Sequence, residues 1–149
     1  MNRVNYWLKA QTQYRVHSPF VFEMYRKVLF ARAKDADVAA FVARLPQEWA
    51  AAVPQGDRRV WRYLELVYKL QGHYRLRVIC LDADEAVLEG DSDGLETVKV
   101  VFRPHHCRAR ELRWTAQKGN AKYNVSIDLF DMGVLMYHPK LHKQHFILR

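Results

Sequence analysis

The sequence has little of several features that define common protein classes. Its 149 residues include two cysteines, six glycines and three serines. Cys80 and Cys107 are too few for a disulfide framework, so we expect a reducing, cytoplasmic environment. The longest apolar runs, such as residues 133–137, are far shorter than the roughly 20 residues that cross a membrane. Residues 1–7 also lack the apolar stretch of a signal peptide. We therefore expect no membrane partner.

Several catalytic and metal-binding motifs are missing as well. No pair of glycines has the spacing of a dinucleotide-binding or phosphate-binding loop, and no serine lies in a Gly-x-Ser-x-Gly turn. The segments 105–107 and 138–145 are rich in histidine, but structural zinc sites use paired ligands at short fixed spacings, with cysteine prominent. The acidic run from Glu89 imitates a calcium loop, yet its twelfth position is Val100 rather than glutamate. The sequence therefore predicts no metal site.

Positive charge dominates what is present. The formal net charge is +8, half of the residues are hydrophobic and 27% are charged, which indicates a globular chain with a preference for acidic partners. Residues 1–34 carry seven basic side chains and one acidic one, and residues 103–123 carry six and one. Residues 82–96 carry seven acids and no basic residue. These blocks are either separate solvated faces, or they neutralise one another within the fold or across a dimer.

Local patterns predict a single domain of the α/β or α+β class, with a helical half (1–72) and a strand half (73–149). Ser18-Pro19 is a strong helix start, Asp35 or Asp37 can cap the next helix, and Asp57 can cap another. The expected helices span 3–14, 19–30, 35–45, 57–72 and 106–118. The expected strands span 76–82, 97–102, 123–130, 134–137 and 145–148, the last two forming an antiparallel hairpin.

Apolar spacing supports the first expected helix, because Val4, Trp7, Leu8 and Gln11 share one helical face. The C-terminal segment is expected to be the structural centre, with these side chains buried: Ile127, Leu129, Val134, Leu135, Phe146 and Leu148.

Two groups of side chains have the chemistry of a binding site. Asp82 and Asp84 end an apolar strand, where carboxylates can bind ribose hydroxyls, although turn carboxylates also occupy such positions. Basic residues interleaved with aromatics fit single-stranded nucleic acid, in which rings stack on bases and arginine meets phosphate. The alternative is that the rings are core and the cations solvated. The nucleic-acid candidates are Arg103, Arg108, Arg110, Arg113 and Lys118.

Both ends of the chain resemble one family. YWLKAQTQYRVHSPFVF (6–22) is similar to the N-terminal helices, with their HSPF element, of small bacterial class I methyltransferases that depend on S-adenosylmethionine (SAM). VSIDLFDMGVL (125–135) and KQHFILR (143–149) resemble the last strands of that family. The resemblance implies a reduced Rossmann-like α/β sheet with N-terminal helices and an antiparallel C-terminal hairpin.

The middle of the chain departs from the family. LRVICLD (76–82) continues into Ala83 where the family has a glycine loop that approaches SAM, and the next glycine is Gly90. By the resemblance, Asp82 or Asp84 corresponds to the ribose-binding acid, and Arg103-Pro-His-His to an active-site edge of which only a histidine is retained. His105 and His106 are therefore the weak catalytic candidates.

These observations lead to three expectations about function. The first is a methyltransferase-like protein that has lost catalysis, binds no cofactor and acts on a protein partner or by self-association. The second is a basic RNA-binding module. The third is a methyltransferase that still binds SAM through Asp82 and Asp84.

Overall fold

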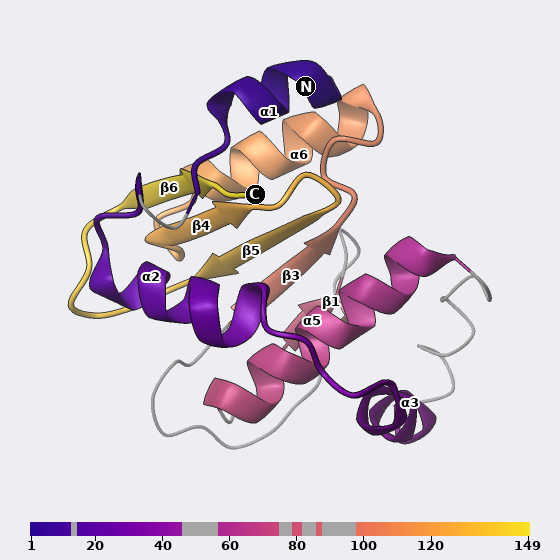
Figure 1. The fold of residues 1–149 in the computed structure, drawn as a ribbon. Helices are drawn as coiled ribbons and strands as arrows, with labels where there is room; N and C mark the ends of the chain where they lie inside the picture. Colours follow the sequence, from indigo (N-terminus) through magenta and orange to yellow (C-terminus); the bar gives the residue numbers. More distant parts are fainter. Residues whose placement is uncertain (13–14, 46–56, 75–78, 82–85, 88–97) are drawn as a thin grey trace.

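The protein is a mixed α/β molecule built on one sheet (Figure 1). The computed structural model describes residues 1–12, 15–45, 57–74, 79–81, 86–87 and 98–149. The strands in these parts lie in the order β2-β1-β3-β5-β4-β6. Their bounds are β1 (Ile79–Leu81), β2 (Ala86–Val87), β3 (Val98–Phe102), β4 (Val125–Asp128), β5 (Met132–Met136) and β6 (Gln144–Ile147).

Local capping explains where several helices begin. The Ser18 hydroxyl accepts a hydrogen bond from Val21 N at 3.4 Å, and Pro19 follows as the first helical residue. Asp57 Oδ1 accepts from Arg59 N at 2.8 Å at the start of the longest helix. The expected aspartate cap of the third helix is wrong, because Lys34 holds that position with no side-chain cap. The helices are α1 (Arg3–Lys9), α2 (Pro19–Met24), the π-helix η2 (Tyr25–Leu29), α3 (Asp35–Ala43), α5 (Arg58–Tyr74) and α6 (Arg108–Gly119).

Strand pairing differs from the expected hairpin of the last two strands. β6 pairs in parallel with β4, from Val125 opposite Gln144 to Asp128 opposite Ile147. The antiparallel hairpin is formed by β4 and β5 instead. β5 also pairs antiparallel with β3, which runs parallel to β1. Both edges of β5 are therefore occupied, and β6 takes the free edge of β4.

The side chain of Asn124 directs the connection from β5 to β6. Its Nδ2 donates to the carbonyl oxygens of His138 (2.7 Å) and Leu141 (2.6 Å), and its Oδ1 accepts from His138 N at 2.8 Å. The backbone oxygen of Asn124 accepts from Gln144 N at 2.7 Å. These bonds fix the connection across the start of β4, so the chain enters β6 beside β4.

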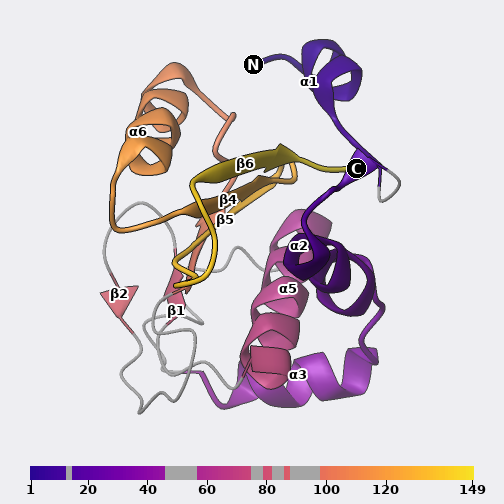
Figure 2. The same cartoon turned by 90° about the vertical axis from the view of Figure 1, so that its left-hand side faces the viewer.

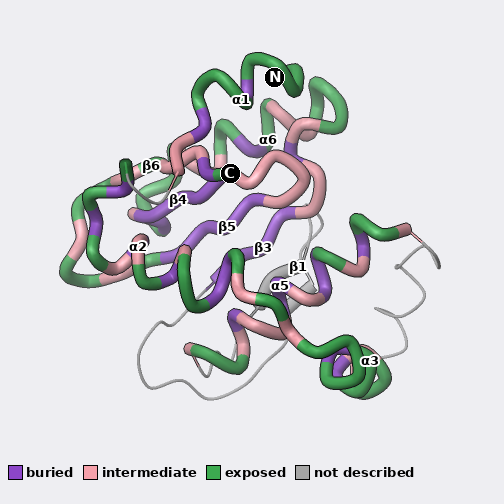
Figure 3. Tube along the Cα trace, viewed as in Figure 1, coloured by how far each residue is buried: buried purple, intermediate pink, exposed green. Residues whose placement is uncertain are grey.

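Helices cover both faces of the sheet (Figure 2). α2, η2 and α5 lie on one face, and α6 lies on the other. Alternate strand residues divide between the two faces, as the pleat of a strand requires. Val100, Ile127 and Val134 join the larger core under α2, η2 and α5, whereas Val101 and Leu135 join the core under α6. Buried segments accordingly concentrate in β3, β4 and β5 (Figure 3).

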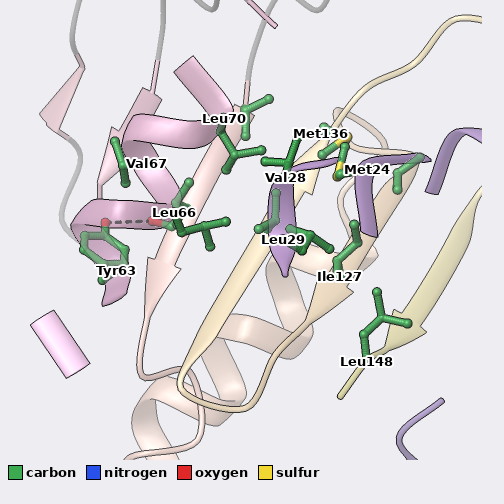
Figure 4. Close-up of a cluster of buried hydrophobic side chains, with 14 of the residues drawn as sticks. Met24, Val28, Leu29, Tyr63, Leu66, Val67, Leu70, Ile127, Met136 and Leu148 are labelled. Carbon is green, nitrogen blue, oxygen red and sulfur yellow. Dashed lines mark hydrogen bonds between the residues drawn. The ribbon is translucent and has the colours of Figure 1, made fainter. Parts of the chain in front are cut away.

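The larger core combines helix and strand side chains from both halves of the chain (Figure 4). Met24, Val28, Val67, Leu70 and Ile127 are all fully buried there. The hydroxyl of Tyr63 donates to Val100 O at 3.1 Å, which ties α5 to the central strand. The helical half and the strand half of the chain therefore share one hydrophobic core.

The core under α6 depends on one glycine. Trp114 is 1% exposed and lies directly over β5. A Cβ atom on Gly133 would come within 2.6 Å of the Trp114 indole, closer than real Cβ atoms approach other atoms. Gly133 therefore leaves the space that the ring fills.

Burial of the terminal segments matches the expectations only in part. Ile127, Val134, Leu135 and Leu148 are buried as expected. Leu129 and Phe146 are only half-buried at the edge of the core. In α1 the apolar side chains of Val4, Trp7 and Leu8 are exposed. The buried residues of this segment are Tyr6 and Ala10.

Candidate functional site

The strongest constellation of polar side chains lies where β3 and β4 end and β5 begins, which we call the carboxyl edge. β3 and β4 both pair antiparallel with β5, so their carboxyl ends meet at this edge. Arg103 and Phe130 follow the two strands with positive φ angles of 50° and 67°, a conformation uncommon outside glycine. The backbone amide of Arg103 donates a hydrogen bond to Asp131 O at 2.8 Å. This bond joins the loop after β3 to the loop after β4.

Asp128 is the centre of the hydrogen bonding at this edge. Its side chain is 1% exposed, and Oδ2 accepts from His105 Nε2 at 2.7 Å and from Trp114 Nε1 at 3.0 Å. Oδ1 accepts from Phe130 N at 2.9 Å. Burial alone would raise the pKa of Asp128, but the hydrogen bonds and charge of His105 and the other donors hold it below its usual range. Asp128 is therefore a buried carboxylate that joins β4 to α6 and to the loop after β3.

The second nitrogen of His105 also faces a carboxylate. Nδ1 lies 3.4 Å from Glu111 Oε1, without hydrogen-bond geometry to any described residue. Glu111 is bonded to the N-terminal ammonium group of Met1, which lowers the pKa of the Glu111 carboxyl. The His105 side chain is only 4% exposed. Both of its ring nitrogens are thus directed at acids of the protein itself.

Tyr6 and Phe130 connect α1 to the same edge. The Tyr6 hydroxyl donates to the backbone oxygens of Leu148 and, at 3.2 Å, Asp128, and burial raises the pKa of this phenol. The Phe130 and Tyr6 rings pack edge to face, with their centres 5.0 Å apart. The Phe130 ring also stacks on the His105 ring, with their centres 5.6 Å apart. The guanidinium of Arg3 lies over the Phe130 ring at 5.2 Å. The first helix is therefore fixed against the end of β4, which carries Asp128, and the loop that carries His105.

Two adjoining open cavities flank this edge, and both are rich in arginine. The smaller, about 230 Å³, is lined by Arg3, Arg59, Arg103, His105, His106, Phe130 and Asp131. The larger, about 610 Å³, shares Arg3, Arg59, Phe130 and Asp131 with it and extends along α5 to the end of η2. Six basic and two acidic side chains line the larger cavity. The basic ones are Arg3, Arg32, Arg59, Arg62, Lys69 and Arg149.

The expected nucleic-acid residues do not gather on one face. Arg103 lies at the carboxyl edge, but the other four are on α6, where steps of 100° per residue distribute them around the helix. Arg110 Nη1 donates to Phe102 O at 2.8 Å. Lys118 Nζ lies 5.4 Å from the Trp114 ring, and burial lowers the pKa of this amine. Arg108 and Arg113 are exposed.

The remaining candidates are placed as follows. Both His105 and His106 line the smaller cavity, but the His105 side chain is almost fully buried at the carboxyl edge, whereas His106 is exposed. Asp82 and Asp84 lie outside the described residues, as does the acidic segment from Glu89. Within the described parts of the chain, no three His, Cys, Asp or Glu side chains group as metal ligands.

Sequence reasoning missed the arginines of α5. Arg59 and Arg62 are spaced i, i+3 on the exposed side of a helix whose inner side is apolar, and this spacing was the available signal. Their significance depends on Arg3 and Asp131, which come from opposite ends of the chain and meet them only in the folded protein.

Comparison of the chain with family models, with curated proteins and with solved structures finds no match. None of the helices in the part of the chain that is described has the length and apolar character to cross a membrane.

Proposed function

We propose that this chain is a methyltransferase-like protein that does not transfer methyl groups and acts by binding a partner. Two features support the relationship to methyltransferases. The first is the resemblance of residues 6–22, 125–135 and 143–149 to that family. The second is the mixed α/β fold with helices on both faces of one sheet, although its last strand, β6, runs parallel to β4 and not antiparallel as the resemblance implies.

The observation that carries the loss of catalysis is the enclosure of His105. A general base must reach the proton of a substrate through a free ring nitrogen. Here Nε2 is bonded to Asp128 at 2.7 Å and Nδ1 faces Glu111 at 3.4 Å. The resemblance places His105 or His106 near the reacting group, and the contacts of His105 with two acids make it a structural residue and leave His106 as the other candidate. The missing glycine loop supports the same conclusion.

Isothermal titration of the whole chain with SAM and with S-adenosylhomocysteine tests this proposal. We expect no binding of either compound at micromolar concentration. Micromolar binding of either one would overturn the proposal and favour the alternative in which the chain retains a cofactor site.

A protein partner, or a second copy of the chain, fits the exposed apolar side chains. Val4 and Leu8 on α1 and Leu112 on α6 are 68%, 80% and 62% exposed, and the two helices are joined by the bond from Met1 to Glu111. Figures 1 and 2 show both helices at the same end of the sheet. Sedimentation at tens of micromolar separates the two possibilities. Self-association that Leu8→Lys abolishes indicates a second copy, whereas a monomer at every concentration and salt rules out a second copy.

An RNA-binding module is the second candidate function. It is favoured by the meeting of the two basic blocks at the smaller cavity, which Arg3 and Arg103 both line. Contacts to phosphate release counterions, so the affinity for RNA would fall steeply as salt rises. An RNA affinity that is insensitive to salt would rule out this candidate.

A further inference from the structure

The larger cavity combines positive charge with exposed aromatic rings. Arg32 and Arg62 are exposed on its wall and have no acidic partner among the described residues. Glu65, one of its two acids, already accepts from Ala33 N at 3.1 Å and lies 3.6 Å from Lys69. Lys69 also donates to Ala31 O at 2.7 Å. The cavity therefore retains uncompensated arginine charge.

Asp131, the other acid, is shared by two arginines. Arg3 Nη2 lies 3.1 Å from Oδ2 and Arg59 Nε lies 4.0 Å from Oδ1. One carboxylate cannot neutralise two guanidinium groups, so this corner of the cavity also carries net positive charge. The paired N–H donors of an arginine guanidinium match the spacing of phosphate oxygens. This part of the cavity, with two arginines and one acid, is therefore suited to a phosphate group.

Two rings lie on the wall of the same cavity. Trp7 on α1 is 53% exposed and Phe30 at the end of η2 is 47% exposed. The guanidinium of Arg149 lies 5.1 Å from the centre of the Trp7 ring. Proteins that bind single-stranded nucleic acid combine basic side chains with aromatic rings on which the bases stack, and this wall of the cavity offers both. The cavity volume of about 610 Å³ is in the range of small-ligand sites.

From these observations we infer that the larger cavity binds a nucleotide unit, with its phosphate near Arg3, Arg59 and Arg62 and its base against Trp7 or Phe30. The inference goes beyond partner binding and does not depend on it. It also gives the RNA-binding candidate a defined site. The unit is either a free nucleotide or one residue of a single-stranded chain, because both present the same phosphate and base.

Titration of the whole chain with 5′-AMP tests the site, with adenosine and inorganic phosphate as half-ligands. We expect saturable binding of AMP and at least tenfold weaker binding of each half-ligand. Arg62→Gln should weaken AMP binding about tenfold, since it removes one charged hydrogen-bond donor. Either Trp7→Ala or Phe30→Ala should weaken the binding of AMP and adenosine and leave the binding of phosphate unchanged, and the variant that does so identifies the stacking ring.

Arg58→Gln is the matched control, because Arg58 is exposed on the same helix and does not line the cavity. It loses the same charge and should leave AMP affinity within twofold. Equal melting temperatures of the two variants would exclude unfolding as a cause. No AMP binding up to millimolar concentration, or equal losses in Arg58→Gln and Arg62→Gln, would overturn the inference.

An eight-residue single-stranded RNA distinguishes the source of the nucleotide. If the RNA binds more than tenfold tighter than AMP and its affinity depends on Arg62, the site binds one residue of a single-stranded RNA. Equal affinities assign it to a free nucleotide, and both results support the site. S-adenosylhomocysteine separates the inference from the proposed function. If S-adenosylhomocysteine binds, the proposal that the chain has lost its cofactor site is overturned. If AMP does not bind, only the inference of a nucleotide site is overturned.

Discussion

His105 Nε2 and Asp128 Oδ2 lie 2.7 Å apart, although the two residues are 23 positions apart in the sequence. Asp128 also accepts from Trp114 on α6, so one carboxylate joins the loop after β3, the end of β4 and the helix between them. The carboxyl edge, with its two cavities, is built around this buried acid.

Asp128→Asn should destabilise the protein by about 2–4 kcal/mol, because it replaces a buried charge that two side-chain donors share. Urea unfolding measures the difference. Asp131→Asn is the control, since its contacts with Arg3 and Arg59 lie near the surface and should contribute less than about 1 kcal/mol. Equal losses in the two variants would show that the Asp128 cluster is not a structural centre.

The pKa of Asp128 is lowered in the folded protein, so its ionised form contributes stability above the unfolded value of about 3.9. That contribution is lost as the pH falls through the lower folded pKa. The difference in unfolding free energy between the parent and Asp128→Asn should therefore shrink as the pH falls from ~5 to below ~4. A difference that stays constant down to pH ~2 would contradict a lowered pKa.

Gly133→Ala should cost about 1–3 kcal/mol, because the new methyl group would overlap the Trp114 ring. Gly72→Ala is the matched control on α5, where a Cβ atom would meet nothing within 4 Å. It should stabilise the helix by about 0.5–1 kcal/mol. Thermal melts of both variants provide the comparison, and a neutral Gly133→Ala would mean that Trp114 does not pack as described.

Asp131→Asn should tighten the binding of AMP several-fold, because the carboxylate competes with phosphate for Arg3 and Arg59. The titration is repeated at two salt concentrations, and the gain should shrink at the higher one. Weaker binding in Asp131→Asn would place the phosphate elsewhere in the molecule.

Local sequence signals predicted the elements better than their pairing. Ser18-Pro19 and Asp57 mark helix starts because a cap acts within three residues. The position of β6 could not be read in this way, since it depends on Asn124 bonding to His138 and Leu141 across the chain reversal. The hairpin was expected because of the turn residues around Pro139, and these residues give no sign of the hydrogen bonds of Asn124.

The candidate site was predicted only in part for a similar reason. His105 became a candidate through the resemblance to methyltransferases, whereas the sequence placed its partner Asp128 only within a strand. The shared apolar side of α1 predicted a helix but not its exposure, because periodicity shows which residues share a side and not which side is covered. Arg59 and Arg62 gained meaning only when the fold placed Arg3 and Asp131 beside them.

The most direct test of the account is a pair of NMR titrations of the labelled chain, one with S-adenosylhomocysteine and one with AMP. The account predicts that AMP shifts the Trp7 indole signal and the amides of Arg3, Arg59 and Asp131, which line the larger cavity. It predicts that S-adenosylhomocysteine leaves the spectrum unchanged at the same concentration. Shifts at His105 and His106 with S-adenosylhomocysteine, and none with AMP, would contradict it.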